Sequence, residues 1–414
     1  MHAIYKCQER EMDTTDYLTL EDQYTTHTYH PLDIVLERGE GVWVYDVQGK
    51  RYLDFLAAYS AMNFGHCHPR LVQAMQEQLG RITLTSRAFR NDQFPLFARE
   101  LCELMGYDML LPMNTGAEAV ETALKVARKW GYTVKGVPAD KANIIVAQDN
   151  FHGRTTTPIS FSSKEQYRAG FGPLTPGFTI IPFGDARALA EAITPETVAF
   201  LLEPIQGDAG VVVLPVGYLQ QVSAICKERG VLWLDDEIQS GLGRMGRLLA
   251  CDHENVKPDV LILGKALAGG LYPVSAVLAP RGILGVLQPG DHGSTFGGNP
   301  LGCAIAREVL RVLQEEQLVE RSAVLGDVLL ERLQQLKSPC VAAVRGRGLW
   351  AGIVLKPEAG GARRYTRLLA QRGLLCKETH ENVIRLAPPL VIEREELDWA
   401  LDQIADVLKI PASE

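Results

Sequence analysis

The sequence predicts an α/β protein in which a mostly parallel sheet is followed by a smaller α+β domain. Three observations predict this class of fold. Short apolar runs recur between about residues 111 and 278, helical patterns fill the gaps between them, and the pattern changes after about residue 299. Continuous apolar strands separated by helices are typical of a parallel sheet that is covered on both faces.

The individual elements follow in chain order. Residues 42–55 (VWVYDVQGKRYLDF) hold two alternating segments around Gln48-Gly49, which predicts a hairpin near the N-terminus. Strands of the large sheet are expected at 143–148, 178–183, 197–205, 231–237, 259–264 and 273–279. Helices are expected at 117–130 and 218–230. Beyond residue 299, two long amphipathic helices are expected before short strands at 341–349, 350–355 and 382–387.

The composition excludes several classes of protein. The formal net charge of -8 argues against a protein that binds the nucleic-acid backbone, because such binding needs a surplus of Lys and Arg. No stretch approaches the roughly 20 apolar residues that a membrane-spanning helix requires. Residues 1–22 contain more acids than bases and lack the apolar core of a signal peptide. We therefore expect a cytoplasmic protein.

Eight cysteines are scattered through the chain without a C-x-x-C motif or a Cys/His spacing typical of zinc. They are Cys7, Cys67, Cys102, Cys226, Cys251, Cys303, Cys340 and Cys376. We expect free thiols in a reducing compartment, most of them buried as small hydrophobic side chains, and no metal site.

Polar residues directly after the apolar runs are the first candidates for a functional site. In an open α/β sheet, ligands bind outside the carboxyl ends of the strands. The candidates at these positions are Asn114, Thr115, Gly116, Asn150, Phe151, Glu203, Asp235, Asp236, Glu237 and Lys265.

The segment MNTGAEAVETALK, residues 113–125, predicts a strand that turns at Thr115-Gly116-Ala117 into a helix. The first turn of a helix presents free backbone N–H groups, and the helix dipole favours an anion such as a phosphate there. The alternative is an ordinary helix capped by Thr115.

Three consecutive acids end the apolar run of residues 231–239. Strand alternation directs Asp235 and Glu237 to one face and Asp236 to the other. Buried carboxylates need a partner, because an unpaired charge in the interior is costly. The alternative is a solvated strand end.

Lys265 follows the apolar run of residues 259–264 and lies 29 residues after Asp236, a distance that suits one helical crossover to another strand of the same sheet. A partly desolvated lysine becomes a nucleophilic amine that can condense with a carbonyl, although most single lysines lie on the surface. A phosphate-binding helix end, a carboxylate and an amine at one sheet edge are the protein groups that pyridoxal phosphate needs. We therefore predict this cofactor.

Long segments of the chain resemble the class III aminotransferases of fold type I. The segment around the lysine, residues 234–277, resembles the lysine-containing motif of that family, and HGSTFGGNPLGC (292–303) resembles the segment that usually follows it. More narrowly, the chain is similar to the ornithine aminotransferases at residues 28–50, 84–89, 111–136, 203–211 and 385–392. The resemblance extends from about residue 29 to about residue 408.

The resemblance implies fold type I and a division of the chain into two domains. It implies a large cofactor-binding domain with a mostly parallel seven-stranded sheet at residues 61–298 and a small α+β domain at 299–414. Residues 1–60 are expected to contribute to the small domain.

The resemblance also implies roles at the cofactor. Lys265 would bond covalently to the cofactor aldehyde and then act as general acid and base, and Asp236 would pair with the pyridine nitrogen. Gln239 would lie near the ring hydroxyl and Phe151 would stack on the ring. The phosphate would be held by Gly116 and Ala117, together with Ser294 and Thr295 from the other subunit of a homodimer.

For the substrates, the family pattern makes Arg154 and Arg385 partners of carboxylates, since arginine offers a bidentate fork that lysine cannot reproduce. Tyr29 and Tyr59 would lie near the incoming amino acid. The partners implied are small molecules, an amino acid and a 2-oxo acid.

Two positions depart from the ornithine-type pattern. His152 stands where these enzymes commonly have tryptophan, a change that we expect to affect shape more than chemistry. Asp208 stands where they have glutamate, an acid thought to mask the arginine that corresponds to Arg385 while ornithine reacts at its terminal amine. The shorter side chain predicts a leakier mask, and so more transfer of the α-amine or a wider range of amines.

The resemblance implies transfer of the δ-amino group of L-ornithine to 2-oxoglutarate, giving L-glutamate 5-semialdehyde and L-glutamate. Alternatives within the same chemistry are aminotransferases for N-acetylornithine, 4-aminobutyrate or other ω-amines. A pyridoxal-phosphate aminomutase or racemase is a further alternative, against which the paired arginines argue. A catalytically inactive scaffold would have lost Lys265 or Asp236, and both are present.

Overall fold

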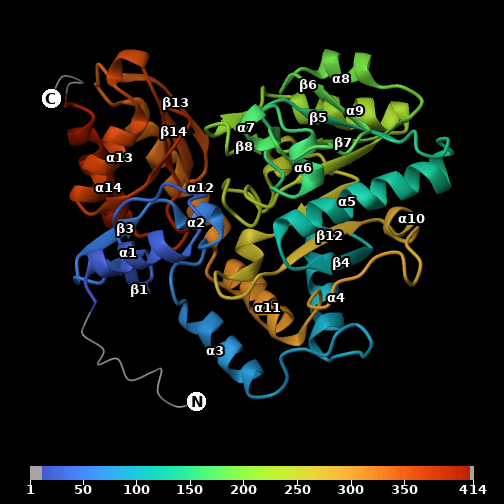
Figure 1. Cartoon of the computed structure of the whole chain (residues 1–414), viewed down its shortest axis with the longest axis horizontal. Helices are drawn as coiled ribbons and strands as arrows, with labels where there is room; N and C mark the ends of the chain where they lie inside the picture. Colours follow the sequence, from blue (N-terminus) through green and yellow to red (C-terminus); the bar gives the residue numbers. More distant parts are fainter. Residues whose placement is uncertain (1–11, 411–414) are drawn as a thin grey trace.

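The structure is a computed structural model, and it describes residues 12–410. Figure 1 shows two lobes, one around a large central sheet and one that holds β13, β14, α13 and α14 next to the N-terminal elements β1 and β3. The large sheet has seven strands in the order β4-β12-β11-β10-β7-β5-β6. These strands are β4 (Met109–Met113), β5 (Asn143–Ala147), β6 (Phe178–Ile181), β7 (Thr197–Leu202), β10 (Leu232–Asp236), β11 (Val260–Leu263) and β12 (Ser275–Ala279).

The large sheet is mostly parallel, as predicted. Strand β10 pairs in parallel with both β7 and β11, and β5 pairs in parallel with β6 and β7. Only β12, among the seven strands, runs against its neighbours β11 and β4. All six expected strand runs form strands, and the expected helices appear as α5 (Gly116–Trp130) and α9 (Tyr218–Arg229).

Helices cover both faces of the large sheet, which explains the continuous apolar strands. Side chains of β10 alternate between two hydrophobic clusters. Leu232 and Leu234 pack in the cluster that contains Val120 of α5, whereas Trp233 packs in the cluster that contains Val222 of α9. The period of two along the strand thus places consecutive residues in different surroundings.

The connection from β10 to β11 differs from the prediction of a helical crossover. It contains turns and one short 3₁₀ helix, η2 (Ala250–Glu254). The segment SGLGRMG interrupts helical geometry, because Leu242, Gly243 and Gly246 have φ values of 54°, 91° and 73°. The two strands are nevertheless direct neighbours, so the expected approach of Asp236 and Lys265 is preserved.

The second lobe contains two four-stranded sheets. One has the order β13-β14-β17-β16 and the other has the order β1-β2-β3-β15. Their strands are β1 (Leu36–Glu40), β2 (Trp43–Asp46), β3 (Arg51–Asp54), β13 (Val341–Arg347), β14 (Trp350–Leu355), β15 (Leu374–Leu375), β16 (Lys377–Thr379) and β17 (Val383–Leu386). The hairpin predicted for residues 42–55 is confirmed as β2 and β3, which pair antiparallel.

The N-terminal hairpin joins a strand from the far end of the chain. β15 pairs in parallel with β3, with Leu374 opposite Leu53. The peptide N–H of Leu53 donates to the carbonyl of Gly373 at 2.8 Å, and that of Phe55 donates to the carbonyl of Leu375 at 2.7 Å. Residues near position 50 and position 375 therefore share one sheet.

The remaining elements surround these sheets. A further small pair consists of β8 (Ile205–Gln206) and β9 (Val212–Val213). The two long helices expected after residue 299 are α11 (Pro300–Glu315) and α12 (Leu318–Gln334), followed by α13 (Ala362–Gln371) and α14 (Arg394–Val407). The others are α1 (Thr14–Tyr24), α2 (Ala57–Ser60), α3 (Pro69–Leu79), α4 (Gln93–Met105), η1 (Gly131–Lys135), α6 (Thr156–Ser160), α7 (Glu165–Arg168), α8 (Ala186–Ala192), η3 (Lys265–Ala268), α10 (Arg281–Leu284) and η4 (Pro357–Ala359).

Two sequence-based expectations can be followed in the described chain. Within residues 12–410, no helix combines the length and the apolar character needed to cross a bilayer. The seven cysteines in this range are free thiols, and Cys7 lies outside it.

Candidate active site

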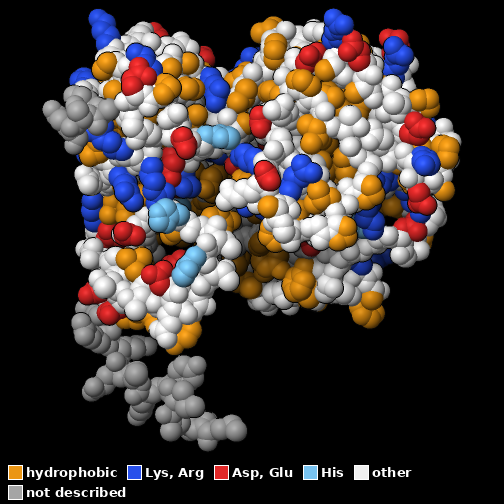
Figure 2. Space-filling view, turned by 45° about the horizontal axis from the view of Figure 1, so that its top comes forward, with side chains coloured by type: hydrophobic (Ala, Val, Ile, Leu, Met, Phe, Trp, Pro, Cys, Tyr) orange, Lys and Arg blue, Asp and Glu red, His pale blue; other side chains and the backbone are white. Residues whose placement is uncertain are grey.

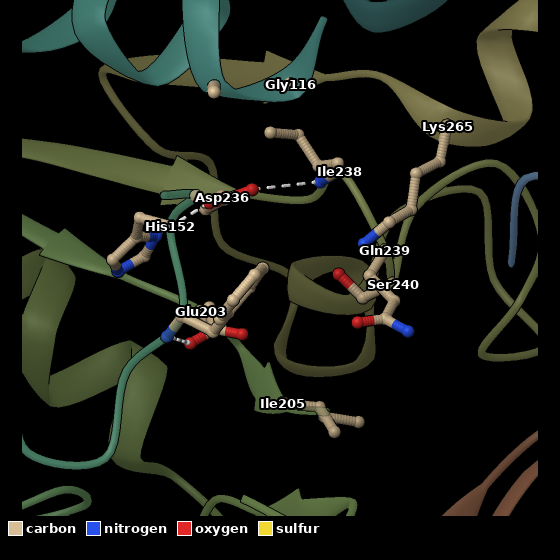
Figure 3. A pocket seen from close by; sticks show the side chains of 12 residues that line it. Gly116, His152, Glu203, Ile205, Asp236, Ile238, Gln239, Ser240 and Lys265 are labelled. Carbon is tan, nitrogen blue, oxygen red and sulfur yellow. Dashed lines mark hydrogen bonds and ion pairs between the residues drawn. The ribbon is translucent and has the colours of Figure 1, made fainter. Parts of the chain in front are cut away.

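A cavity of about 190 Å³ lies at the carboxyl ends of the strands of the large sheet. Its lining residues follow β4, β5, β7, β10 and β11, the strand ends that the sequence singled out. They are Gly116, Ala117, Phe151, His152, Gly153, Glu203, Ile205, Asp236, Ile238, Gln239, Ser240 and Lys265. Figure 3 shows that Asp236 and Lys265 extend into this one cavity from neighbouring strands.

The N-terminus of α5 forms one wall of the cavity. Thr115 caps this helix, and its Oγ1 accepts from the N–H of Glu118 at 3.2 Å, while Glu118 Oε2 accepts from the N–H of Thr115 at 2.8 Å. The following N–H groups of Gly116 and Ala117 belong to the first helical turn and have no partner within the helix. A Cβ added at Gly116 would lie 3.1 Å from Ile238 Cδ1, so the helix end approaches the opposite wall closely. Capping and anion binding are thus compatible here.

Asp236 ends β10 on the cavity side, with 6% of the residue exposed. Its Oδ2 lies 2.6 Å from Nδ1 of His152, and its Oδ1 accepts from the N–H of Ile238 at 3.1 Å. Burial disfavours the charged imidazole, but the hydrogen bond and the charge of Asp236 outweigh this and raise the pKa of His152. The imidazole can therefore supply a positive charge to Asp236.

The sequence suggested that His152 mainly affects the shape of the site, but the structure gives it an electrostatic effect as well. Its side chain is fully buried, and its Nε2 has no hydrogen-bond partner in the described chain. The contact with Asp236 joins residues that are 84 positions apart, so no local pattern reveals it. The replacement of an indole by an imidazole thus changes the electrostatics of the site as well as its volume.

Lys265 begins η3 directly after β11, with a φ of 40°. Its Nζ points into the cavity on the side of Gln239, across from Asp236 and His152 (Figure 3). Burial, reinforced by the charge of Arg385, lowers the pKa of Lys265 to about 8. An appreciable fraction of this amine is therefore unprotonated near neutral pH, as a nucleophile requires.

Glu203 is a cavity residue to which the sequence gave no role. It follows β7, and its Oε2 accepts from the N–H of Phe151 at 2.9 Å, which fixes the segment that carries Phe151 and His152. Burial raises the pKa of Glu203 to about 7. The only signal in the sequence was its position at a strand end.

The residues expected to bind substrate carboxylates lie outside the enclosed cavity. Arg385 on β17 is 3% exposed, and its guanidinium lies 5.1 Å from the ring centroids of both Tyr59 and Trp350. Its Nε and Nη2 have no hydrogen-bond partner among the described residues. Burial lowers the pKa of Arg385 to about 10, so the group remains a cation at neutral pH.

The remaining substrate candidates are more exposed. Arg154 lies over the ring of Tyr167 at 3.8 Å and 5.4 Å from the ring of Phe151. Tyr29 is 81% exposed, and Tyr59 has a φ of 59° in a strained turn. Figure 2 shows a hollow between the two lobes, with acidic and basic side chains gathered at its rim.

Asp208 forms no ion pair with Arg385 in the described chain. Its Oδ2 contacts Nζ of Lys164, a residue that the sequence analysis did not consider. The aspartate is one methylene shorter than a glutamate, and its carboxylate is paired with the lysine. The charge of Asp208 still acts on Arg385 and raises its pKa against the effect of burial.

Ser294 and Thr295 do not line the cavity of their own chain. Ser294 Oγ accepts from Asn114 Nδ2 at 2.9 Å, and Thr295 is exposed. Their expected contribution to the phosphate site of a second subunit remains a prediction.

The residues present fit pyridoxal phosphate. The cavity offers an anion-binding helix end, an aromatic ring at Phe151, a carboxylate at Asp236 and a buried amine at Lys265. In addition, Nε2 of Gln239 is buried without a partner in the described chain and is free to donate to a ligand. The fold and this cavity define an enzyme of the pyridoxal-phosphate class with fold type I.

Comparison with known proteins identifies the family. Residues 24–408 match the model of the family Aminotransferase class-III, so the chain belongs to the class-III aminotransferases, which use pyridoxal 5'-phosphate. An ornithine aminotransferase of Geobacillus sp. (strain WCH70) is 57% identical and covers 95% of this chain and 98% of its own length. One of Bordetella pertussis (strain Tohama I) is 56% identical over 94% of both chains.

Solved structures give the same family. The ornithine aminotransferase from Toxoplasma gondii ME49 has a TM-score of 0.94 at 44% identity, covering 96% of this chain and 95% of its own. The acetylornithine aminotransferase from Elizabethkingia anophelis has a TM-score of 0.88 at 46% identity, covering 96% and 99%.

Proposed function

We propose that this enzyme transfers the δ-amino group of L-ornithine to 2-oxoglutarate and produces L-glutamate 5-semialdehyde and L-glutamate. The observation that carries the proposal is the combination of the cavity around Lys265 and Asp236 with near-full-length relatives named as ornithine aminotransferases. The semialdehyde product then cyclises.

When bound, pyridoxal phosphate supplies an aldehyde that takes up an amino group and a ring that accepts electron density. Lys265 would bond to the cofactor aldehyde through its Nζ. It would then act as the general acid and base of the reaction. Its lowered pKa of about 8 suits both tasks, because the amine can lose and regain a proton near neutral pH. Asp236 would hold the ring nitrogen of the cofactor and stabilise positive charge there, and His152 is hydrogen-bonded to the same carboxylate.

The two arginines orient the substrates. We propose that Arg154 and Arg385 each bind one carboxylate of the dicarboxylic acid, since a guanidinium can donate two parallel hydrogen bonds to a carboxylate. The free Nε and Nη2 of Arg385 are compatible with this role. Tyr29 and Tyr59 would contact the incoming amino acid. The guanidinium of Arg385 lies 5.1 Å from the ring centroid of Tyr59.

We further propose a homodimer in the cytoplasm. Ser294 and Thr295 are not among the residues that line the cavity of their own chain, which is compatible with a phosphate site shared between subunits. The free thiols support a reducing compartment. The domain division at residues 61–298 and 299–414, with residues 1–60 in the small domain, is likewise a proposal. It is supported by the pairing of β15 with β3, whereas α11 also packs against α3 and α4.

N-Acetylornithine is the second candidate donor, because an acetylornithine aminotransferase is 46% identical to this chain. Acylation removes the charge of the α-amine, so the same δ-amine would react.

The test is a panel of amine donors with 2-oxoglutarate, with the products identified by mass spectrometry. We expect L-ornithine to give the highest kcat/KM and a product with the mass of cyclised glutamate semialdehyde. A higher kcat/KM for N-acetylornithine or 4-aminobutyrate would overturn the assignment. Conversion without any 2-oxo acid would instead indicate an aminomutase or a racemase.

A further inference from the structure

Asp208 contacts one cation, Lys164, and its charge acts on a second cation, Arg385. Its carboxylate contacts Nζ of Lys164, and the two side chains are 30% and 23% exposed. It forms no ion pair with Arg385 in the described chain, although its charge acts on that residue. One acid is therefore available to two cations from different parts of the chain.

Hydrogen bonds hold the backbone around Asp208 in place. Thr379 Oγ1 donates to the carbonyl of Asp208 at 2.6 Å. Arg345 Nε donates to the carbonyl of Gly210 at 2.6 Å, and its Nη2 donates to that of Ala209 at 3.3 Å. These three hydrogen bonds hold the backbone of residues 208–210, so a change of partner would be made by the side chain of Asp208.

Arg385 is a buried cation that lacks a hydrogen-bonded anion in the described chain. It is 3% exposed, two of its three guanidinium nitrogens lack a hydrogen bond, and its neighbours are the rings of Tyr59 and Trp350. A buried cation without a hydrogen-bonded partner is costly. Either a ligand carboxylate or a released Asp208 could meet this demand.

Lys164 is itself positioned on the substrate side of the molecule. Its backbone N–H donates to Ser162 Oγ at 3.2 Å, and it precedes α7, whose Tyr167 ring lies 5.3 Å from Lys164 Nζ. The same ring lies 3.8 Å from the guanidinium of Arg154. Lys164 therefore shares the ring of Tyr167 with Arg154, and it contacts the acid whose charge acts on Arg385.

We propose that Lys164 is a specificity-determining residue that holds Asp208 away from Arg385 and so leaves Arg385 free for the second carboxylate of a dicarboxylic acid. The inference rests on the proposed function only in that Arg385 receives a substrate carboxylate. It predicts that loss of Lys164 allows Asp208 to turn to Arg385 and to compete with the dicarboxylic acid.

The experiment measures the binding of glutarate, an unreactive dicarboxylate, to the holoenzyme by calorimetry, with pentanoate as a monocarboxylate of similar length. Lys164→Met is expected to weaken glutarate binding by roughly 5-fold, the equivalent of one partly exposed ion pair, and to change pentanoate binding less. Lys164→Arg keeps the charge and should bind glutarate about as the wild type does. Unchanged glutarate binding in Lys164→Met would overturn the proposal.

A second pair of variants separates this role from direct attraction of the ligand. In an Asp208→Asn background, the acid can no longer compete for Arg385, so adding Lys164→Met should leave glutarate binding unchanged. An equal weakening in both backgrounds would mean that Lys164 attracts the ligand itself, and the proposal would fall. Because glutarate binding involves no amine donor, the result is independent of whether ornithine is the donor.

Discussion

Each face of the end of β10 carries an aspartate, but the two aspartates differ in their hydrogen-bond partners. On the cavity face, Asp236 is bonded to His152 and to the N–H of Ile238. On the interior face, Asp235 is fully buried and neither carboxylate oxygen has a hydrogen-bond partner in the described chain. Adjacent acids in one strand therefore differ in whether a partner for their charge is provided.

The interior face compensates by holding protons. Asp235 lies beside Glu237 and Cys251, with their ligand atoms within 4.8 Å of one another. Burial, together with the charge of Glu237, raises the pKa of Asp235, and burial raises the pKa of Glu237 to about 7. The sequence showed no metal-type spacing, yet the fold brings a cysteine beside two acids. The comparison teaches that a buried acid to which the fold supplies no cation, such as Asp235, has a raised pKa and so tends to hold its proton.

The largest effect is expected from changing one face and sparing the other. Asp236→Ala removes the charge opposite the cofactor, so kcat should fall by at least about 10²-fold and the cofactor should bind more weakly. The matched control, Asp235→Ala, removes the neighbouring carboxyl group and should leave kcat within about 3-fold. Steady-state kinetics and cofactor titration measure both. Equal losses of kcat in the two variants would remove the distinction between the faces.

A smaller effect is expected from the residue that supports Asp236. His152→Phe removes the 2.6 Å contact but keeps an aromatic ring, and kcat/KM should fall by roughly 10-fold, the value of one hydrogen bond to a charged group.

His152→Asn is the control for His152→Phe, since its amide can still donate to Asp236, and it should recover most of the activity. The pH titration of the cofactor's visible absorbance should move in His152→Phe and not in His152→Asn. A role in packing alone would give the reverse order of activities.

The smallest effect concerns stability on the interior face. The folded chain binds protons at Asp235 and Glu237 that the unfolded chain has already released, because their folded pKa values are raised. The free energy of unfolding should therefore fall as pH rises from the unfolded values near 4 through about 7.

Asp235→Asn should flatten this fall and be more stable than the wild type at pH 8 by about 1 to 3 kcal/mol, with little difference at pH 5. Denaturant unfolding at several pH values measures the slope. Asp327→Asn, an exposed position on α12, should keep the wild-type slope. A wild-type slope in Asp235→Asn would mean that Asp235 releases its proton at the same pH in both states.

Local pattern was sufficient for the arrangement along β10. The period of two predicted that Asp235 and Glu237 share a face and that Asp236 faces the other way, and the structure places them so. The apolar run before Lys265 predicted that this residue follows another strand of the same sheet, and that strand, β11, is a neighbour of β10. These features depend on strand geometry, which adjacent residues determine.

Contacts between distant side chains could not be predicted in this way. His152, in the segment after β5, pairs with Asp236 at the end of β10, and the two residues are 84 positions apart. The pair of Lys164 with Asp208 spans 44 residues. In both cases the choice of partner depends on rotamers and on which competing charge lies nearer. The sequence predicted that Asp208 would mask Arg385 less well than a glutamate, but it could not predict Lys164 as the partner of Asp208.

The pairing of β3 with β15 has a consequence for synthesis on the ribosome. The hairpin of β2 and β3 emerges early, but the strand that completes its open edge is translated more than 300 residues later. Until then, the main-chain groups of Leu53 and Phe55 lack their partners at Gly373 and Leu375. The nascent chain therefore carries an unprotected strand edge for most of its elongation, a stage at which chaperones that shield such edges would be needed.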